Sequence, residues 1–150
     1  MQPVPRAPTP SALLAALFAL ALATALGATG CAPDIGDSCD TSVNCDVNGT
    51  RICDLAQPGG YCTVEYCESG TCPAGSVCVQ FEPTPSRLAR TWCMASCTDD
   101  SDCRTDEGYG CRAVTDAPLC NAPTPCAPEA SLAQVLDEGQ AGARFCTAVR

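Results

Sequence analysis

Cysteine is the residue type whose number and spacing carry most of the chemistry that this sequence offers. The chain has 150 residues and 15 cysteines, with 17 acidic residues and no histidine. All 8 basic residues are arginines, so lysine is absent as well. Without histidine and lysine there is no imidazole base, no Schiff-base amine and no Cys-His or Ser-His-Asp nucleophile. We therefore expect a protein that is not an enzyme and holds no cofactor.

Acidic residues are the remaining candidates for catalysis or metal binding. Asp99, Asp100 and Asp102 fall in the short segment 99–107, where clustered carboxylates could perform acid–base chemistry or bind Ca²⁺. The segment lacks the spacing of an EF-hand loop, and a solvated surface is the more common role. Zinc sites usually combine closely spaced cysteine pairs with histidine, and an oxidising compartment removes free thiols. The sequence therefore predicts no metal site.

The gaps between cysteines repeat along the chain. One set of four has gaps of 5, 7 and 8 residues, and the same three gaps occur again 58 positions later. These two sets are Cys39, Cys45, Cys53 and Cys62, and Cys97, Cys103, Cys111 and Cys120. Between them lie Cys67, Cys72, Cys78 and Cys93, and beyond them Cys126 and Cys146. We interpret this as three tandem four-cysteine modules, residues 39–62, 67–93 and 97–120, followed by a disulfide-closed loop, residues 126–146.

Within each module the favoured pairing joins the first cysteine to the third and the second to the fourth, for example Cys39–Cys53 and Cys45–Cys62. Bridges between neighbouring cysteines are the alternative, because four cysteines allow three connectivities that a sequence does not separate. From Cys31 onward Leu, Ile, Val and Phe number 17 of 120 residues, or 14%, below the roughly 20% of an ordinary packed core. Disulfides must therefore replace part of the core, and the compartment must be oxidising.

Few segments predict regular secondary structure, so the fold class is small, disulfide-rich and mostly irregular or β with short hairpins. Val77, Val79 and Phe81 alternate, as do Arg90, Trp92 and Met94, and with prolines between the two runs they predict an antiparallel hairpin with a protruding loop. Asn48-Gly49 and the stretch 58–60 are turn signals, the former favouring a hairpin. One short C-terminal helix is expected over 128–138, because Pro128 suits a first turn and its apolar residues share a helical face.

The first 30 residues have the order of an export signal. Arg6 precedes an uncharged apolar run, residues 12–26, and small residues follow at 27–30. A membrane-spanning anchor is the alternative, because 12–32 is uncharged over 21 residues. Both interpretations place the cysteines outside the cytoplasm.

The string Ala28-Thr29-Gly30-Cys31 resembles the lipobox of bacterial lipoproteins. The resemblance implies that residues 1–30 are removed and that Cys31 becomes an N-terminus carrying a diacylglycerol and an acyl chain such as palmitate. Residues 31–38 would then be a short tether, and Ala32 favours the outer membrane. Fifteen cysteines cannot all pair, whereas setting Cys31 aside leaves fourteen. Ordinary signal-peptidase cleavage, with Cys31 free or bridged, is the alternative.

The stretch CTDDSDC, residues 97–103, followed by Gly110-Cys111, resembles the repeats of myxobacterial-type Cys-rich lipoproteins, an uncharacterised family, as does CESGTCPAGSVC, residues 67–78. The resemblance implies a surface location. The C-x-x-D-x-x-C stretch also resembles whey-acidic-protein inhibitors, although the adjacent Cys-Cys of that family is absent. The expected function is a cell-envelope-anchored, disulfide-stapled binding or structural module. The alternative is a secreted inhibitor or toxin-like knot.

Charge limits the class of partner. From Cys31 onward 7 arginines stand against 17 acids, a net charge of 7 − 17 = −10, which disfavours nucleic acid and requires an anchor for membrane contact. Arg87, Arg90 and Trp92 bring basic and aromatic side chains together. We expect these residues to contact an acidic polysaccharide or protein at the cell surface. The alternative is that Trp92 packs on nearby disulfides.

Overall fold

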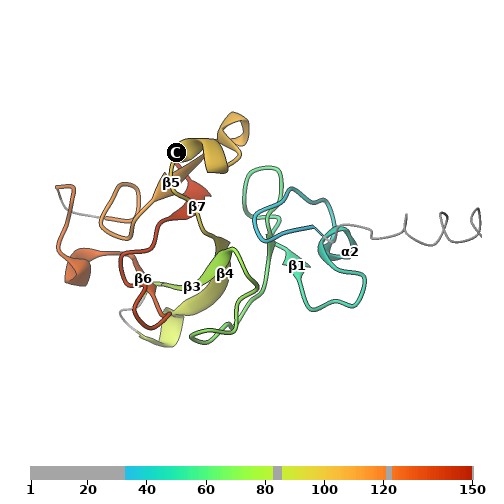
Figure 1. Ribbon diagram of the computed structural model, residues 1–150, viewed down its shortest axis with the longest axis horizontal. Helices are drawn as coiled ribbons and strands as arrows, with labels where there is room; N and C mark the ends of the chain where they lie inside the picture. Colours follow the sequence, from blue (N-terminus) through green and yellow to red (C-terminus); the bar gives the residue numbers. More distant parts are fainter. Residues whose placement is uncertain (1–32, 83–85, 121–122, 150) are drawn as a thin grey trace, which may run out of the picture. The chain divides into compact units, whose positions relative to one another are not determined.

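Short strands and turns make up most of the protein. The computed structural model describes residues 33–82, 86–120 and 123–149, which belong to one compact unit (Figure 1). It contains the four-residue helix α2, Ser42–Cys45, and the strands β1, Ile52–Cys53, β2, Cys62–Thr63, β3, Ser76–Phe81, β4, Arg90–Ala95, β5, Tyr109–Arg112, β6, Ala133–Val135, and β7, Phe145–Ala148. Four 3₁₀ turns complete it: η1, Ser86–Leu88, η2, Asp100–Asp102, η3, Thr105–Glu107, and η4, Pro128–Ala130. The expected small, disulfide-rich fold of antiparallel hairpins is confirmed.

The strands form three small antiparallel sheets with the orders β1–β2, β4–β3–β6 and β5–β7. The hairpin predicted from alternating residues is confirmed, because β3 pairs with β4 along its whole length. The turn at 58–60 joins β1 to β2, and Gly60 is required there. Its φ is +69°, and a Cβ atom would lie 1.9 Å from the carbonyl oxygen of Cys39.

The predicted C-terminal helix is wrong. Residues Pro128–Ala130 form only the turn η4, and Ala133–Val135 then pair with β3, with Val135 opposite Val79. Ala133 and Val135 are buried while Gln134 between them is exposed, which is the two-residue period of a strand. Burial against β3 therefore outweighs the helical spacing of the apolar residues. The helix that the structure does contain, α2, lies near the other end of the described chain.

The Asn48-Gly49 turn does not make the predicted hairpin. It follows α2 directly, and the Gly49 N–H donates to the carbonyl oxygen of Asp46 at 3.1 Å. The Asp46 carboxylate also accepts the N–H groups of Asn48 and Thr50, at 2.8 and 3.1 Å. A side chain therefore closes the loop without a second strand.

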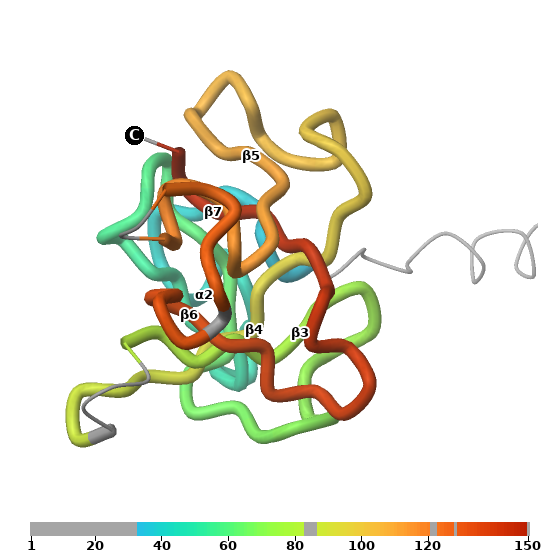
Figure 2. The backbone as a smooth tube through the Cα atoms, turned by 90° about the vertical axis from the view of Figure 1, so that its left-hand side faces the viewer, coloured from blue at the N-terminus to red at the C-terminus, as the bar shows by residue number. Residues whose placement is uncertain are grey.

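One hydrophobic core serves all three cysteine modules. Tyr61, Val79 and Tyr109 come from the three modules and Phe145 comes from the chain end, and each is at most 2% exposed in one cluster. The Tyr61 hydroxyl accepts a hydrogen bond from Ala95 N at 2.9 Å and donates to the Cys146 carbonyl oxygen at 3.3 Å. Its ring lies 5.5 Å from that of Tyr109. Strand β7 runs beside β5, with which it pairs (Figure 2). The modules are therefore packed together and are not separate beads.

Arg104 joins the first module to the third. Its guanidinium stacks on the Tyr109 ring at 4.5 Å from the centroid and donates to the carbonyl oxygens of Gly36 and Gly60, at 2.9 and 2.6 Å. It also forms an ion pair with Glu107. The Gly36 contact belongs to the segment that the sequence assigned to a tether. Ile35 in that segment is only 7% exposed, so the second half of the predicted tether is part of the folded body.

Candidate functional site

Fourteen cysteines form seven disulfides, which indicates an oxidising location outside the cytoplasm. The bridges are Cys39–Cys53, Cys45–Cys62, Cys67–Cys78, Cys72–Cys93, Cys97–Cys111, Cys103–Cys146 and Cys120–Cys126. The predicted first-to-third and second-to-fourth pairing is confirmed for the first two modules and for Cys97–Cys111. It is wrong for Cys103, which bonds to Cys146 and not to Cys120. The predicted Cys126–Cys146 loop closure is wrong for the same reason.

A common geometry explains both the correct and the incorrect pairings. The third cysteine of each module lies directly opposite another cysteine on the neighbouring strand, in the pairs Cys53 with Cys62, Cys78 with Cys93 and Cys111 with Cys146. The third cysteine bonds to the first, and its cross-strand neighbour bonds to the second. In the third module that neighbour is Cys146, because β5 pairs with β7. We call each such set of four cysteines a cross-strand unit.

The cysteines carry no free thiol chemistry in the described part of the chain. The close cysteine groups, such as Cys97, Cys103 and Cys146, have the proximity of a metal site, but each member is disulfide-bonded. A bridged sulfur is not the thiolate that binds zinc or acts as a nucleophile. The chemistry of this framework is therefore structural.

Two of the three predicted contact residues come together. Arg90 and Trp92 project from β4 on the face that also carries Phe81 and Met94, and all four line one pocket of about 290 Å³. We call this the aromatic pocket. The remaining lining residues are Asp54, Ala56, Gln57, Tyr61, Thr63 and Thr147. Arg87 does not line it, because it lies on η1 with an exposed side chain.

Two hydroxyl groups that line the aromatic pocket are already hydrogen-bonded within the protein. Thr63 donates its hydroxyl to the Cys93 carbonyl oxygen at 2.8 Å, and the Tyr61 hydroxyl is occupied as described above. Burial raises the pKa of Tyr61, so the phenol stays neutral. No buried side-chain nitrogen or oxygen among the described residues lacks a hydrogen-bond partner. The pocket therefore offers apolar contact at Trp92, Phe81 and Met94, and the Tyr61 and Thr63 hydroxyls in it are already paired.

Opposite charges lie among the lining residues of the pocket. Asp54 comes from the loop after β1, and Arg90 comes from the start of β4. The Arg90 side chain is 65% exposed, and Nη1 lies 3.6 Å from Glu65 Oε1. Such an exposed pair is worth little energetically, so the guanidinium stays available to a partner.

Several lining residues were not predicted from the sequence. Phe81 had a usable signal, because it alternates with Val77 and Val79 and lies opposite Arg90 in the hairpin. Trp92 is half-buried and packs against the core, which contains the disulfide-bonded Cys78 and Cys93, whereas its contact with a partner stays a prediction. Thr147 reaches the pocket through the β5–β7 pairing, for which the sequence gives no local signal.

The acidic loop has a structural role. Asp100 Oδ1 accepts the Cys111 N–H at 2.8 Å and Arg112 Nη1 at 2.7 Å, and these two donors hold its pKa below the ordinary value. Hydrogen bonds from Thr98 likewise lower the pKa of Asp102. The cluster thus caps its own turn and joins η2 to β5.

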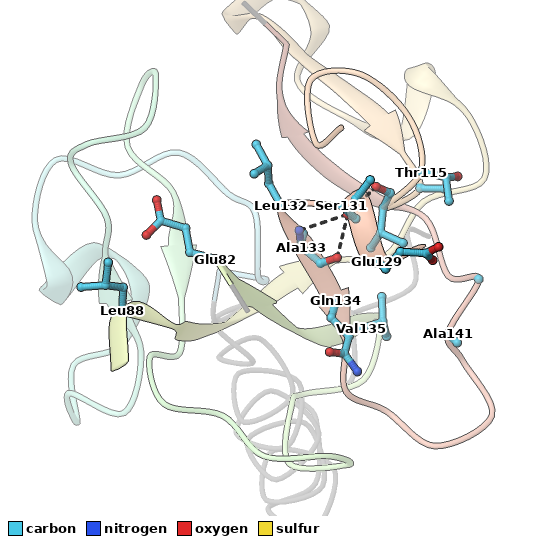
Figure 3. A pocket seen from close by; sticks show the side chains of 14 residues that line it. Glu82, Leu88, Thr115, Glu129, Ser131, Leu132, Ala133, Gln134, Val135 and Ala141 are labelled. Carbon is cyan, nitrogen blue, oxygen red and sulfur yellow. Dashed lines mark hydrogen bonds between the residues drawn. The ribbon is translucent and has the colours of Figure 1, made fainter. Parts of the chain in front are cut away.

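A larger, open groove of about 1210 Å³ follows β6 (Figure 3). Glu82 and Leu88 lie on one side of the strand, and Glu129 and Thr115 lie on the other. Among the described residues, no helix has the length and apolar character needed to cross a bilayer. The predicted signal peptide, residues 1–30, and Cys31 lie outside the described residues.

Comparison with known proteins gives no match: no family model, no curated protein and no solved structure matches this chain.

Proposed function

We propose that this protein is a lipoprotein of the cell envelope, anchored through Cys31, that binds a partner outside the cytoplasm and has no enzymatic activity. The observation that carries the proposal is the cysteine count. Fourteen of the 15 cysteines pair with one another, which leaves 15 − 14 = 1, Cys31, without a partner cysteine in the chain. That residue directly follows the lipobox-like string Ala28-Thr29-Gly30, and lipidation gives its thiol a use.

Acylation is sufficient to hold such a body at a membrane. Each buried methylene contributes about 0.8 kcal/mol, so two or three chains together anchor a protein stably where one chain holds it only weakly. The body itself, with net charge −10 from Cys31 onward, is repelled by an anionic surface. The lipid would therefore supply the attachment while the folded part faces outward, in keeping with an outer-membrane location.

The aromatic pocket supports the binding part of the proposal. A 290 Å³ space walled by Trp92, Phe81 and Met94 suits one apolar side chain of a protein. A sugar fits less well, because its hydroxyl groups would find the Tyr61 and Thr63 hydroxyls already paired. Arg90 at the pocket and Arg87 in the adjoining β3–β4 connection would meet an acidic group beside that side chain. We therefore favour a surface protein over a polysaccharide as the partner.

The anchor is tested by replacing Cys31. In the producing cell, Cys31→Ala should abolish incorporation of an acyl-chain probe and move the protein out of the membrane fraction. Ser38→Ala is the matched control, because Ser38 is exposed and close in sequence, and it should keep both signals. A membrane fraction unchanged in Cys31→Ala contradicts lipid anchoring. If the parent chain were secreted and carried no acyl label, the result would instead favour the alternative, a secreted inhibitor or toxin-like knot.

The pocket is tested by filling it. Ala56 is exposed and lines the pocket, whereas Leu55 beside it is 67% exposed and does not line it. Surface cross-linking in living cells should capture a protein adduct that Ala56→Trp abolishes and Leu55→Trp retains. With the partner isolated, Arg87→Ala/Arg90→Ala should slow association at low salt. An adduct insensitive to Ala56→Trp rejects the pocket as the site, and turnover in a hydrolase screen rejects the absence of activity.

A further inference from the structure

The two outer edges of the β4–β3–β6 sheet differ. The edge of β4 is covered by the segment 64–66, since Cys93 N donates to the Val64 carbonyl oxygen at 3.0 Å and Tyr66 N donates to that of Thr91 at 2.8 Å. In the described part of the chain, no named strand pairs with the other edge of β6, and only the segment 119–120 meets its start, through the Cys120–Ser131 β-bridge and the Leu132 N–H, which donates to the Leu119 carbonyl oxygen at 2.7 Å. An edge strand presents N–H and C=O groups that template another chain.

The register shows which groups of β6 face outward. Leu136 N donates to the Cys78 carbonyl oxygen at 2.9 Å, and Glu82 N donates to that of Leu132 at 2.8 Å. In an antiparallel ladder every second residue faces the neighbouring strand, so 134, 136 and the carbonyl oxygen of 132 face β3, while the Leu132 N–H donates to Leu119. The backbone groups of Ala133 and Val135 therefore point away from the sheet.

The outward-facing backbone groups of Ala133 and Val135 differ in their hydrogen bonding. The Ser131 hydroxyl accepts the Ala133 N–H at 3.1 Å and lies 2.8 Å from the Ala133 carbonyl oxygen (Figure 3). The N–H and carbonyl oxygen of Val135 have no hydrogen-bond partner among the residues that the structure describes. The Ser131 hydroxyl thus blocks one position of the edge, and one position with both a donor and an acceptor is open.

The groove described above follows this open position. Its volume of about 1210 Å³ exceeds the 300 to 1,000 Å³ that is usual for small molecules, so a segment of chain suits it better. One wall is the segment 113–115, and Ser131 Oγ holds it in place by lying 2.6 Å from the Val114 carbonyl oxygen. Glu82 and Glu129 are the charged lining residues, both acidic and both exposed.

We propose that the open edge of β6 binds an extended, positively charged peptide segment of a partner protein, which adds to the sheet as a further strand. Val135 would exchange two main-chain hydrogen bonds with the peptide, and lysine or arginine side chains would meet Glu82 and Glu129. Two copies of this chain would bring the same acids and the same net negative charge together, which disfavours self-pairing. This site is separate from the aromatic pocket, so neither proposal depends on the other.

The probe is a pair of end-blocked octapeptide pools. Both have mixed Val, Ile and Thr at alternate positions, with lysine at the remaining positions in one pool and glutamate in the other. The full Cys31→Ala chain should retain the lysine pool saturably and leave the glutamate pool. In amide hydrogen exchange, the bound pool should slow exchange of the Val135 amide more than that of any other amide. A lysine pool in which alternate backbone nitrogens are methylated should bind at least about tenfold more weakly, because it lacks the donors.

Variants separate strand addition from general attraction to an acidic protein. Val135→Pro removes the open donor at an edge position where proline is tolerated, and should weaken binding about tenfold. Glu82→Gln/Glu129→Gln should weaken it about threefold or more at low salt, and the matched control Glu68→Gln/Glu138→Gln, at exposed acids outside the groove, should not. The proposal is overturned if the protein does not retain the lysine pool or binds the methylated pool equally well. It is also overturned if both pairs of glutamate substitutions weaken binding equally. Concentration-dependent dimerisation that protects Val135 without peptide would show that a second copy is the occupant, which also overturns it.

Discussion

The first and third cysteine modules have the same three gaps but complete their second bridges differently. In the first, Cys45 bonds to Cys62, which follows the third cysteine of the module after a short turn. In the third, Cys103 bonds to Cys146, which lies 146 − 111 = 35 positions beyond Cys111. The Cα–Cα distances of these two bridges are nevertheless 5.3 and 5.5 Å.

The difference shows that the repeated feature is the cross-strand unit and not the gap between cysteines. In each unit the third cysteine faces a cysteine on the neighbouring strand, and strand pairing decides which cysteine that is. A local hairpin supplies it in the first two modules, and the chain end supplies it in the third. Cys120 is left over by this choice and closes the short bridge to Cys126.

The largest expected effect comes from removing the bridge that makes the third unit long-range. Cys103→Ala/Cys146→Ala should lower the free energy of unfolding by about 4 kcal/mol, whereas Cys120→Ala/Cys126→Ala should lower it by about 2 kcal/mol, because the first bridge closes a longer loop. Denaturant unfolding of these pairs in the Cys31→Ala background measures both values. Equal losses would mean that the third unit is no more important to the fold than the local bridge.

This difference between the modules also shows which contacts could be predicted from the sequence and which could not. The gaps and the alternation in 77–81 and 90–94 were enough to predict the hairpin and the two bridges that hold it, Cys67–Cys78 and Cys72–Cys93, because those contacts are local. The partner of β5 was not predictable, because the segments 109–112 and 145–148 carry no pairing signal across so long a separation. The helix expected at 128–138 failed for a related reason, since only β3 beside it makes Ala133–Val135 a strand. Arg90 and Trp92 were predicted to act together, but the Tyr61 wall of their pocket depends on the shared core.

A second effect tests whether the first and third modules depend on each other. Arg104→Ala removes charged hydrogen bonds to Gly36 and Gly60 and the stacking on Tyr109, and it should cost about 2 to 3 kcal/mol. Arg87→Ala is the matched control, because its side chain is exposed on η1, and it should stay within about 0.5 kcal/mol. If thermal or denaturant unfolding gave the same midpoint for both variants, the modules would be independent.

Burial of Tyr61 in the shared core should also affect how the free energy of unfolding changes at alkaline pH. Burial raises the pKa of Tyr61, so the folded state keeps a proton that the unfolded state loses above about pH 10. Its contribution is fully present below that pH and is lost as the pH rises further. Tyr61→Phe should flatten this alkaline loss while costing about 1 to 3 kcal/mol at neutral pH, since Ala95 N loses its acceptor. An alkaline loss of the same steepness in both proteins contradicts the burial of a neutral phenol.

The smallest effect lies at acidic pH and concerns the third module alone. The pKa of Asp100 is lowered by the Cys111 N–H and by Arg112, so the folded state binds fewer protons than the unfolded state. The resulting stability is present above the ordinary aspartate value of about 4 and is lost as the pH falls below it. Asp100→Asn should make the unfolding midpoint less dependent on pH in that window. If the unfolding midpoint of Asp100→Asn depended on pH in the same way as that of the parent, the link that Asp100 makes between η2 and β5 would not contribute to stability.

The cross-strand unit is tested most directly by mapping the bridges of the unreduced protein with trypsin at mildly acidic pH, where disulfides do not exchange. Because every basic residue is an arginine, cleavage separates the fragments 91–104, 113–144 and 145–150. Our account predicts that 145–150 stays linked to 91–104 through Cys103–Cys146, while 113–144 is released with one internal bridge, Cys120–Cys126. A fragment 113–144 linked to both of the others would mean that Cys120 and Cys126 bond to Cys103 and Cys146 and not to each other, and would contradict the cross-strand unit of the third module.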